Sequence, residues 1–182
     1  MQEFHGQFIE PEKIAKQLDL KPGEKVADLG CGPGFFVMEI AKIVGDEGKV
    51  FAIDILAKQL ESVESLARTN FLFNIETLQL NIESEDSLKK LLKHGQMDKL
   101  IISNVLSENQ NKSDIIKECL KLLKPGGELI IIDWQKNQLP MGPKAEMMAD
   151  PLRVLEFCKK LGLSLKKEID TGQFHWGYIF SK

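Results

Sequence analysis

A short apolar run that ends in three glycines at alternate positions limits the possible folds of this chain more than any other stretch. The run Val26–Leu29 predicts a buried strand, Gly30, Gly32 and Gly34 follow it, and Phe35–Ala41 is rich in good helix formers. Such glycines can adopt positive φ and let a ligand lie directly on the main chain. The start of the following helix offers free N–H groups that suit a carboxylate or a phosphate. The stretch therefore predicts a strand, a glycine-rich turn and a helix around a small ligand.

The spacing of these glycines and the acidic residue before them narrow the class of ligand. A dinucleotide-binding turn has the form Gly-x-Gly-x-x-Gly, but here Phe35 stands where the third glycine would fall. The Gly-Lys-Ser/Thr ending of a Walker loop is absent. A carboxylate at Asp28 would repel a pyrophosphate and attract an amino group. We therefore infer a ligand that carries an ammonium as well as a carboxylate, as an amino acid does.

In these residues the chain resembles the class I S-adenosylmethionine-dependent methyltransferases, whose first motif has this form. The resemblance extends from about residue 20 to the end of the chain, where a Leu-Lys-Pro-Gly-Gly unit before a strand is a second shared feature. It implies S-adenosylmethionine as cofactor and S-adenosylhomocysteine as product. The cofactor-binding turn would comprise Asp28, Gly30, Cys31, Gly32 and Gly34. The alternative is a purely structural turn in some other α/β protein.

Length, charge and cysteine content favour a single soluble domain. The 182 residues fit one domain, 1–182, and the net charge of −3 lacks the basic excess of a nucleic-acid-binding protein. Cys31, Cys119 and Cys158 are scattered, which predicts a reducing compartment without a disulfide framework or a metal site. No secretory signal or membrane-spanning run is evident. We expect a cytoplasmic protein with a small-molecule substrate and no nucleic-acid or membrane partner, and the oligomeric state stays open.

The acidic residue after the second predicted strand has two possible roles. Asp54 follows the strand Lys49–Ile53 about 20 residues past the glycine turn, where an acidic residue meets a ribose in nucleotide-binding folds. A carboxylate can accept hydrogen bonds from both ribose hydroxyls, each worth roughly 1.5–3 kcal/mol. Alternatively, Asp54 caps a helix over 57–67. The glycine turn upstream favours the ribose, and the resemblance places Ile55 beside it as a further cofactor contact.

Two more strand ends carry candidate contacts. After the strand Ile75–Leu80, the resembling family often has an aspartate that binds the adenine amino group and then an apolar residue; Asn81 and Ile82 hold these places. The amide oxygen of Asn81 can accept the same hydrogen bond, or the residue forms a turn or cap before the next helix. Asn104 follows the fourth strand and would contact the cofactor or the substrate, because ligands bind at the carboxyl ends of parallel strands.

Alternating strands and helices predict a doubly wound α/β fold. We expect a Rossmann-like sheet that is mostly parallel, with an antiparallel C-terminal hairpin and helices on both faces. Helices are predicted over 11–18, 57–67, 87–93, 115–123 and 151–161, and the hairpin strands over 163–169 and 174–180. Residues 1–20 form an N-terminal arm and helix that would help to close the substrate pocket, as in the resembling enzymes. Residues 135–150 form a loop long enough to be a lid.

Few side chains are candidates for catalysis, and methyl transfer needs few. Positioning and dehydration can supply roughly 7–11 kcal/mol of the barrier reduction. Where the acceptor carries a proton, His5 is the only histidine expected near the pocket and is our candidate base, with an exposed arm residue as the alternative. Trp134 either lines the pocket and stacks on the substrate or packs in the core. His94 is expected at a helix end, and His175 is expected to pack among aromatic residues.

These features predict S-adenosylmethionine-dependent methyl transfer to a small molecule by in-line displacement. The segments 133–136 and 141–143 resemble those of small quinone- and arsenite-type methyltransferases. Arsenite chemistry needs a set of cysteines around the substrate, and only Cys31 lies near the turn. A non-catalytic S-adenosylmethionine sensor or inactive subunit is the alternative. The glycine spacing disfavours a nicotinamide oxidoreductase.

Overall fold

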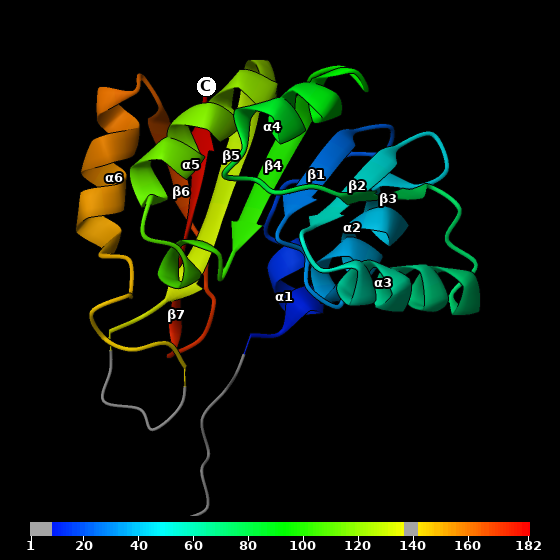
Figure 1. Ribbon diagram of the computed structural model, residues 1–182, viewed down its shortest axis with the longest axis horizontal. Coiled ribbons are helices and arrows are strands. Elements are labelled where there is room, and N and C mark those ends of the chain that lie inside the picture. Colours follow the sequence, from blue (N-terminus) through cyan, green and yellow to red (C-terminus); the bar gives the residue numbers. More distant parts are fainter. Residues whose placement is uncertain (1–8, 137–141) are drawn as a thin grey trace, which may run out of the picture.

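The computed structural model describes residues 9–136 and 142–182, in which seven strands form one sheet (Figure 1). The strands stand in the order β3-β2-β1-β4-β5-β7-β6. Neighbours from β3 to β5 are parallel, whereas β7 is antiparallel to both β5 and β6. The strands are β1 (Lys25–Leu29), β2 (Lys49–Asp54), β3 (Ile75–Gln79), β4 (Met97–Ser103), β5 (Leu123–Trp134), β6 (Ser164–Glu168) and β7 (His175–Ser181). The predicted mostly parallel sheet with its antiparallel C-terminal pair is confirmed.

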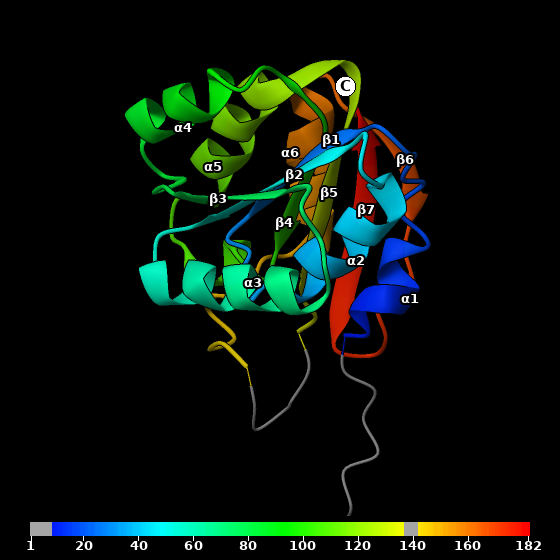
Figure 2. The ribbon, with the colours of Figure 1, turned by 90° about the vertical axis from the view of Figure 1, so that its right-hand side faces the viewer.

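Helices cover both faces of this sheet (Figures 1 and 2). One face carries α4, α5 and α6, and the other carries α1, α2 and α3. The helices are α1 (Pro11–Ala15), α2 (Phe35–Val44), α3 (Ala57–Thr69), α4 (Glu85–Leu92), α5 (Lys112–Cys119) and α6 (Pro151–Lys160), with 3-10 turns η1 (Leu106–Glu108) and η2 (Leu120–Leu122). None of the helices within the described ranges is long and apolar enough to cross a bilayer.

Each face of the sheet has its own apolar core. Along β4, Leu100 and Ile102 belong to the core beneath α4–α6, whereas Ile101 between them belongs to the core beneath α1–α3. On β5, Ile131 and Ile130 divide in the same way. Successive side chains of a strand point to opposite faces, so a strand buried on both sides is apolar at nearly every position. This double burial explains the continuous apolar runs in the sequence.

The order of the strands creates a crevice beside β1. From β1 the chain moves outward through β2 to β3, and it then returns to pair β4 with the other edge of β1. The strand order therefore reverses its direction at β1. The connections that leave β1 and β4 diverge at the carboxyl ends of these strands, where open α/β sheets bind their ligands. The glycine turn after β1 and the residues after β4 therefore border one crevice.

The largest departure from the predicted elements lies between α5 and β5. The predicted helix over 115–123 ends at Cys119, and a 3-10 turn follows it. The strand β5 already begins at Leu123, because that residue pairs with Met97 at the start of β4 through an irregular register. Pairing with a distant strand thus draws the Lys-Pro-Gly-Gly segment into the sheet. The extent of the predicted single domain, 1–182, stays a prediction.

Candidate functional site

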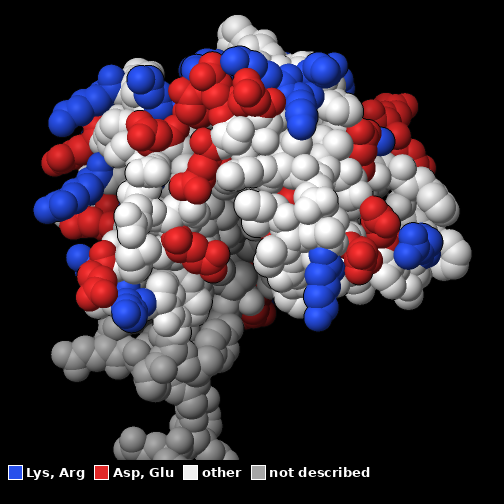
Figure 3. Space-filling model, viewed as in Figure 1, with Lys and Arg blue, Asp and Glu red and all other residues white. Residues whose placement is uncertain are grey.

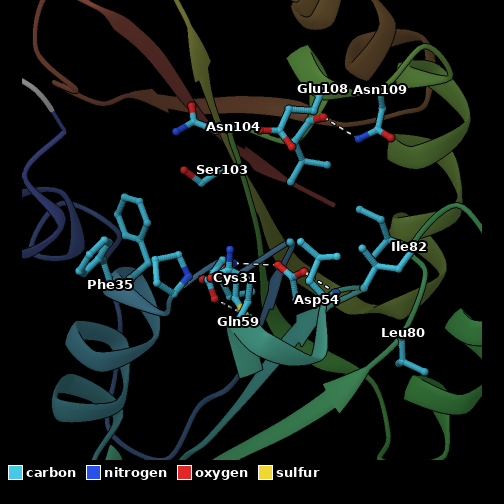
Figure 4. A pocket seen from close by; sticks show the side chains of 18 of the residues that line it. Cys31, Phe35, Asp54, Gln59, Leu80, Ile82, Ser103, Asn104, Glu108 and Asn109 are labelled. Carbon is cyan, nitrogen blue, oxygen red and sulfur yellow. Dashed lines mark hydrogen bonds between the residues drawn. The ribbon is translucent and has the colours of Figure 1, made fainter. Parts of the chain in front are cut away.

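A cavity of about 840 Å³ opens at the carboxyl ends of β1, β2 and β4 (Figure 4). This volume lies within the range of small-molecule sites. Its described walls come from the turn after β1, the start of α3, the segment after β3, η1, and the adjoining ends of β5 and β7. The structure places nearly all of the predicted cofactor residues in these walls, namely Asp28, Gly30, Cys31, Gly32, Asp54, Ile55, Asn81, Ile82 and Asn104. Gly34 is not among the lining residues.

The three glycines of the turn serve different purposes. All three have positive φ. A Cβ atom at Gly30 would lie 2.5 Å from Val105 Cγ2, and one at Gly34 would lie 2.6 Å from Val63 Cγ2. A Cβ atom at Gly32 would meet nothing within 4 Å. Close packing therefore demands glycine at positions 30 and 34, and Gly32 exposes its main chain to the cavity.

Asp28 brings an unpaired carboxyl group to the base of this cavity. Its side chain is 1% exposed, and its Oδ1 atom has no hydrogen-bond partner among the described residues. Burial, and after it the charge of Asp54, raises the pKa of Asp28 from 3.8 to about 7. A buried carboxylate without a partner is unfavourable. A cationic group of a ligand would relieve that penalty.

Asp54 is held in place by two backbone N–H groups. Gly32 N donates to its Oδ2 atom at 2.9 Å, and Leu56 N donates to its Oδ1 atom at 2.9 Å. The N-cap residue of α3 is Leu56, so Asp54 orients the connection before the helix without capping it. Each carboxylate oxygen keeps a second lone pair. The carboxylate is thus oriented in the cavity wall, and its predicted contact with a ribose stays a prediction.

Asn81 combines a turn with a place in the cavity wall. Its Oδ1 atom accepts a hydrogen bond from Glu83 N at 2.9 Å, and its carbonyl oxygen accepts one from Ser84 N at 3.0 Å. Ser84, not Asn81, is the N-cap residue of α4. Apolar walls nearby come from Ile82, which is half-buried, and from Ile55, which is 57% exposed. The predicted adenine contact of Asn81 stays a prediction.

Asn104 joins an unusual backbone conformation to an unpaired amide oxygen. Its φ of +59° is left-handed, a region that asparagine tolerates better than most residues. Its N–H group donates to Ile132 O at 2.9 Å, which ties the end of β4 to β5. Its Oδ1 atom is buried without a partner among the described residues. The backbone at Asn104 is therefore locally strained, and its Oδ1 atom could accept a hydrogen bond from a ligand.

Two aromatic rings line the cavity at the adjoining ends of β5 and β7. Trp134 ends β5 and His175 begins β7, and the two residues are partners across the antiparallel pair. Their ring centroids lie 4.3 Å apart. Both rings line the cavity, and His175 is only 6% exposed. The sequence predicts the burial of His175 but places only His5 near the pocket. The structure corrects this expectation, because strand register brings His175 into the cavity wall.

The described cavity walls carry acidic side chains and no lysine or arginine. The acidic residues are Asp28, Asp54, Glu83 and Glu108. Burial, and after it the charges of Asp133 and Asp54, raises the pKa of Glu108. Figure 3, which has the same view as Figure 1, shows a central hollow in the surface, and most basic side chains in this view lie nearer the margins. The field of the cavity therefore favours cationic ligands over anionic ones.

Comparison with known proteins decides which family this chain belongs to. A family model described as a methyltransferase domain matches residues 20–181. The chain belongs to this methyltransferase domain family. A solved S-adenosylmethionine-dependent methyltransferase from Aquifex aeolicus superposes with a TM-score of 0.80 at 25% identity and covers 96% of this chain and 90% of its own.

Two curated relatives of this methyltransferase domain have names that refer to quinones. A ubiquinone/menaquinone biosynthesis C-methyltransferase from Francisella philomiragia is 31% identical over 131 residues, which are 71% of this chain and 50% of the relative. A demethylmenaquinone methyltransferase from Lactococcus lactis is 28% identical over 133 residues, which are 73% of this chain and 51% of the relative. The chain spans about half the length of these curated relatives. The predicted family, enzyme class and cofactor, S-adenosylmethionine, are confirmed.

The residues of this methyltransferase domain fit S-adenosylmethionine. The unpaired Asp28 suits the ammonium of its amino-acid part, and the open main chain at Gly32 can approach the carboxylate. The acidic walls suit a positively charged sulfonium. Cys31 is buried, and burial raises the pKa of its thiol, so it is a neutral wall residue. No group of metal-binding side chains occurs in the described ranges.

Two predictions reach beyond the described part of this methyltransferase domain. His5, the candidate base, lies outside the described residues, as do residues 137–141 of the predicted lid. From the arm, Ile9 and Pro11 line the cavity. From the predicted lid, a Cβ atom at Gly142 would lie 3.1 Å from the ring of Trp134, so the chain returns close to that ring. The roles of the arm and of the lid stay predictions.

Proposed function

We propose that this domain transfers the methyl group of S-adenosylmethionine to a small neutral acceptor by in-line displacement. The observation that carries the proposal is the unpaired carboxyl group of Asp28 beside a glycine turn, in a cavity whose described walls lack lysine and arginine. Asp28 would hold the ammonium of the cofactor, Asp54 the ribose, and Asn81 with Ile82 the adenine. The cofactor supplies an activated methyl group on a sulfonium.

The chain contributes mainly position and exclusion of water. The main chain at Gly32 and the oriented carboxylate of Asp54 hold the cofactor at the base of the cavity. The space beside Trp134 and Asn104 receives the acceptor. Correct placement of two reactants can supply roughly 7–11 kcal/mol of barrier reduction. An acceptor without a proton to lose therefore needs no acid–base pair. A quinol-type acceptor loses one proton for each methyl group that it gains, and the candidate base for that proton, His5, lies outside the described residues.

Quinol-type ring compounds are the first acceptors to test. One of the relatives above is named a ubiquinone/menaquinone biosynthesis C-methyltransferase and the other a demethylmenaquinone methyltransferase. Arsenite is a poor candidate, because Cys119 and Cys158 are buried in the core beneath α4–α6 and only Cys31 of the described cysteines reaches the cavity.

Three free, buried cysteines and a net charge of −3 support a cytoplasmic protein that acts on small molecules rather than on nucleic acid.

Calorimetry and turnover together test this proposal. The protein should bind S-adenosylmethionine and S-adenosylhomocysteine but not NAD. Asp54→Ala should weaken S-adenosylhomocysteine binding by roughly tenfold or more, since one charge-assisted hydrogen bond is worth about 1.5–3 kcal/mol. Asp46→Ala, which removes an exposed carboxylate from a distant turn, is the matched control.

Three results would count against the proposal. Binding of NAD in place of the adenosyl ligands would refute the cofactor assignment. Equal affinity of Asp54→Ala and wild-type protein, with both variants folded by circular dichroism, would remove the ribose contact. Tight binding without transfer of a radiolabelled methyl group to any quinol, catechol or amine acceptor would favour the sensor alternative.

A further inference from the structure

We propose that His175 binds the methyl acceptor, holding a hydroxyl group of a neutral ring compound against Trp134. This inference rests on the proposed function, because it assigns the part of the cavity that the cofactor leaves free. It adds a substrate-binding residue to the side of the cavity that Trp134 and Asn104 line.

The position of His175 is set by the sheet itself. His175 pairs with Trp134 where β7 begins and β5 ends. At the next residue of β7, Trp176 Nε1 donates a hydrogen bond to the backbone oxygen of Trp134 at 3.1 Å, which holds the two strand ends together. Because β7 runs antiparallel to β5, its first residue lies at the edge of the sheet where the parallel strands end. A side chain on this scaffold is held more firmly than one on a loop.

His175 has hydrogen-bonding capacity that the described protein leaves unused. The side chain is 6% exposed, and neither Nδ1 nor Nε2 has a partner among the described residues. Leaving a buried polar atom unpaired is unfavourable. His94 offers a contrast, because its Nδ1 atom lies 3.4 Å from Glu76 Oε1. A ligand in the cavity would satisfy His175 in the way that a neighbour satisfies His94.

The charge state of His175 specifies which ligand group it can hold. Burial lowers the pKa of His175 to about 4, so the ring is neutral at pH 7. A neutral imidazole has one donor nitrogen and one acceptor nitrogen, and a hydroxyl group can bond to either of them. It offers no charge to pair with a carboxylate or phosphate. Because His175 is neutral and the cavity walls are acidic, the site disfavours anionic methyl acceptors.

The neighbouring ring defines the shape of the favoured acceptor. Trp134 lies 4.3 Å from the imidazole between ring centroids, with a 39° angle between the planes. The backbone at Gly142 closes on the six-membered ring of the tryptophan, where a Cβ atom would come within 3.1 Å. Aromatic surfaces of this kind stack on flat ligands. A flat, neutral, hydroxylated ring is therefore the expected acceptor.

A pair of probes that differ only in hydroxyl groups tests the inference. Wild-type protein saturated with S-adenosylhomocysteine is titrated with 1,4-dihydroxynaphthalene and with naphthalene, under argon. His175→Phe keeps a ring beside Trp134 and removes both nitrogens, whereas His175→Gln restores an amide donor and acceptor. His94→Phe is the matched control. We expect His175→Phe to lose at least tenfold in affinity for the dihydroxy probe and none for naphthalene, with partial recovery in His175→Gln.

The same titrations separate this inference from the proposed function. The affinity for S-adenosylhomocysteine should be equal in wild-type and His175→Phe protein. Failure of the wild-type protein to bind that ligand would refute the proposed function. Two other results would overturn only the role of His175, provided that S-adenosylhomocysteine binds normally. One is equal affinity of wild-type and His175→Phe protein for dihydroxynaphthalene. The other is that wild-type protein binds neither probe. A merely structural histidine would lower the affinity for both probes alike.

Discussion

Replacing Asp28 with asparagine should stabilise the ligand-free protein and at the same time weaken cofactor binding. The carboxyl group is 1% exposed and its Oδ1 atom has no partner among the described residues, so ionisation in the folded state is unfavourable. Burial first, and the charge of Asp54 second, raises its pKa from 3.8 to about 7. Asparagine keeps the shape of the side chain and cannot ionise. The same substitution removes the charge that would hold the ammonium of the cofactor.

The sign and size of the stability effect follow from proton linkage. A group whose pKa is raised by folding contributes its stability in full below its unfolded pKa, and that contribution is lost as the pH rises through the folded pKa. With values of 3.8 and about 7 for Asp28, the penalty is about 3 kcal/mol at pH 6 and about 4 kcal/mol at pH 8. The advantage of Asp28→Asn should therefore grow by about 1.4 kcal/mol between these pH values.

Urea unfolding at pH 6 and pH 8 measures this difference, with Asp46→Asn as the exposed control. Binding supplies a second measurement. If only ionised Asp28 binds the ligand, wild-type affinity for S-adenosylhomocysteine should rise about eightfold from pH 6 to pH 7.5, and the variant should lack this rise. A stability difference that does not change with pH would refute the assigned ionisation. Equal ligand affinity in the variant and the wild type would refute the ammonium contact.

Two further predictions concern the packing around the site and the sheet. Gly30→Ala should destabilise the protein by about 1–3 kcal/mol in urea unfolding, because the new Cβ would lie 2.5 Å from Val105 Cγ2. The double variant with Val105→Ala should recover part of that loss, and no recovery would contradict the steric explanation. Lys99→Met should cost about 1.5–3 kcal/mol, because the carboxylate of Glu128 loses its buried cation and keeps Lys166 as a partner. The double variant with Glu128→Gln should recover most of the lost stability. If Lys99→Met alone leaves the free energy of unfolding unchanged, Lys166, 2.6 Å from the same carboxylate, is a sufficient partner.

Local patterns in the sequence were sufficient to predict the class of fold and the base of the site. Apolar runs mark the strands, because each strand is buried on both faces of the sheet. The alternate glycines mark the turn after β1, since only glycine adopts positive φ readily at three such positions. Asp28 and Asp54 could be found because each directly adjoins a strand end or the turn. Alternation near the C-terminus was likewise enough to predict the hairpin.

Contacts between distant segments decided the rest. The clash that requires glycine at Gly30 comes from Val105, 75 positions away in the chain, and no local pattern reveals it. The early start of β5 depends on the pairing of Leu123 with Met97. The place of His175 beside Trp134 depends on strand register, and a shift of one residue would turn the side chain to the opposite face. Periodicity predicts which elements form, whereas register and close packing determine which side chains meet in the cavity.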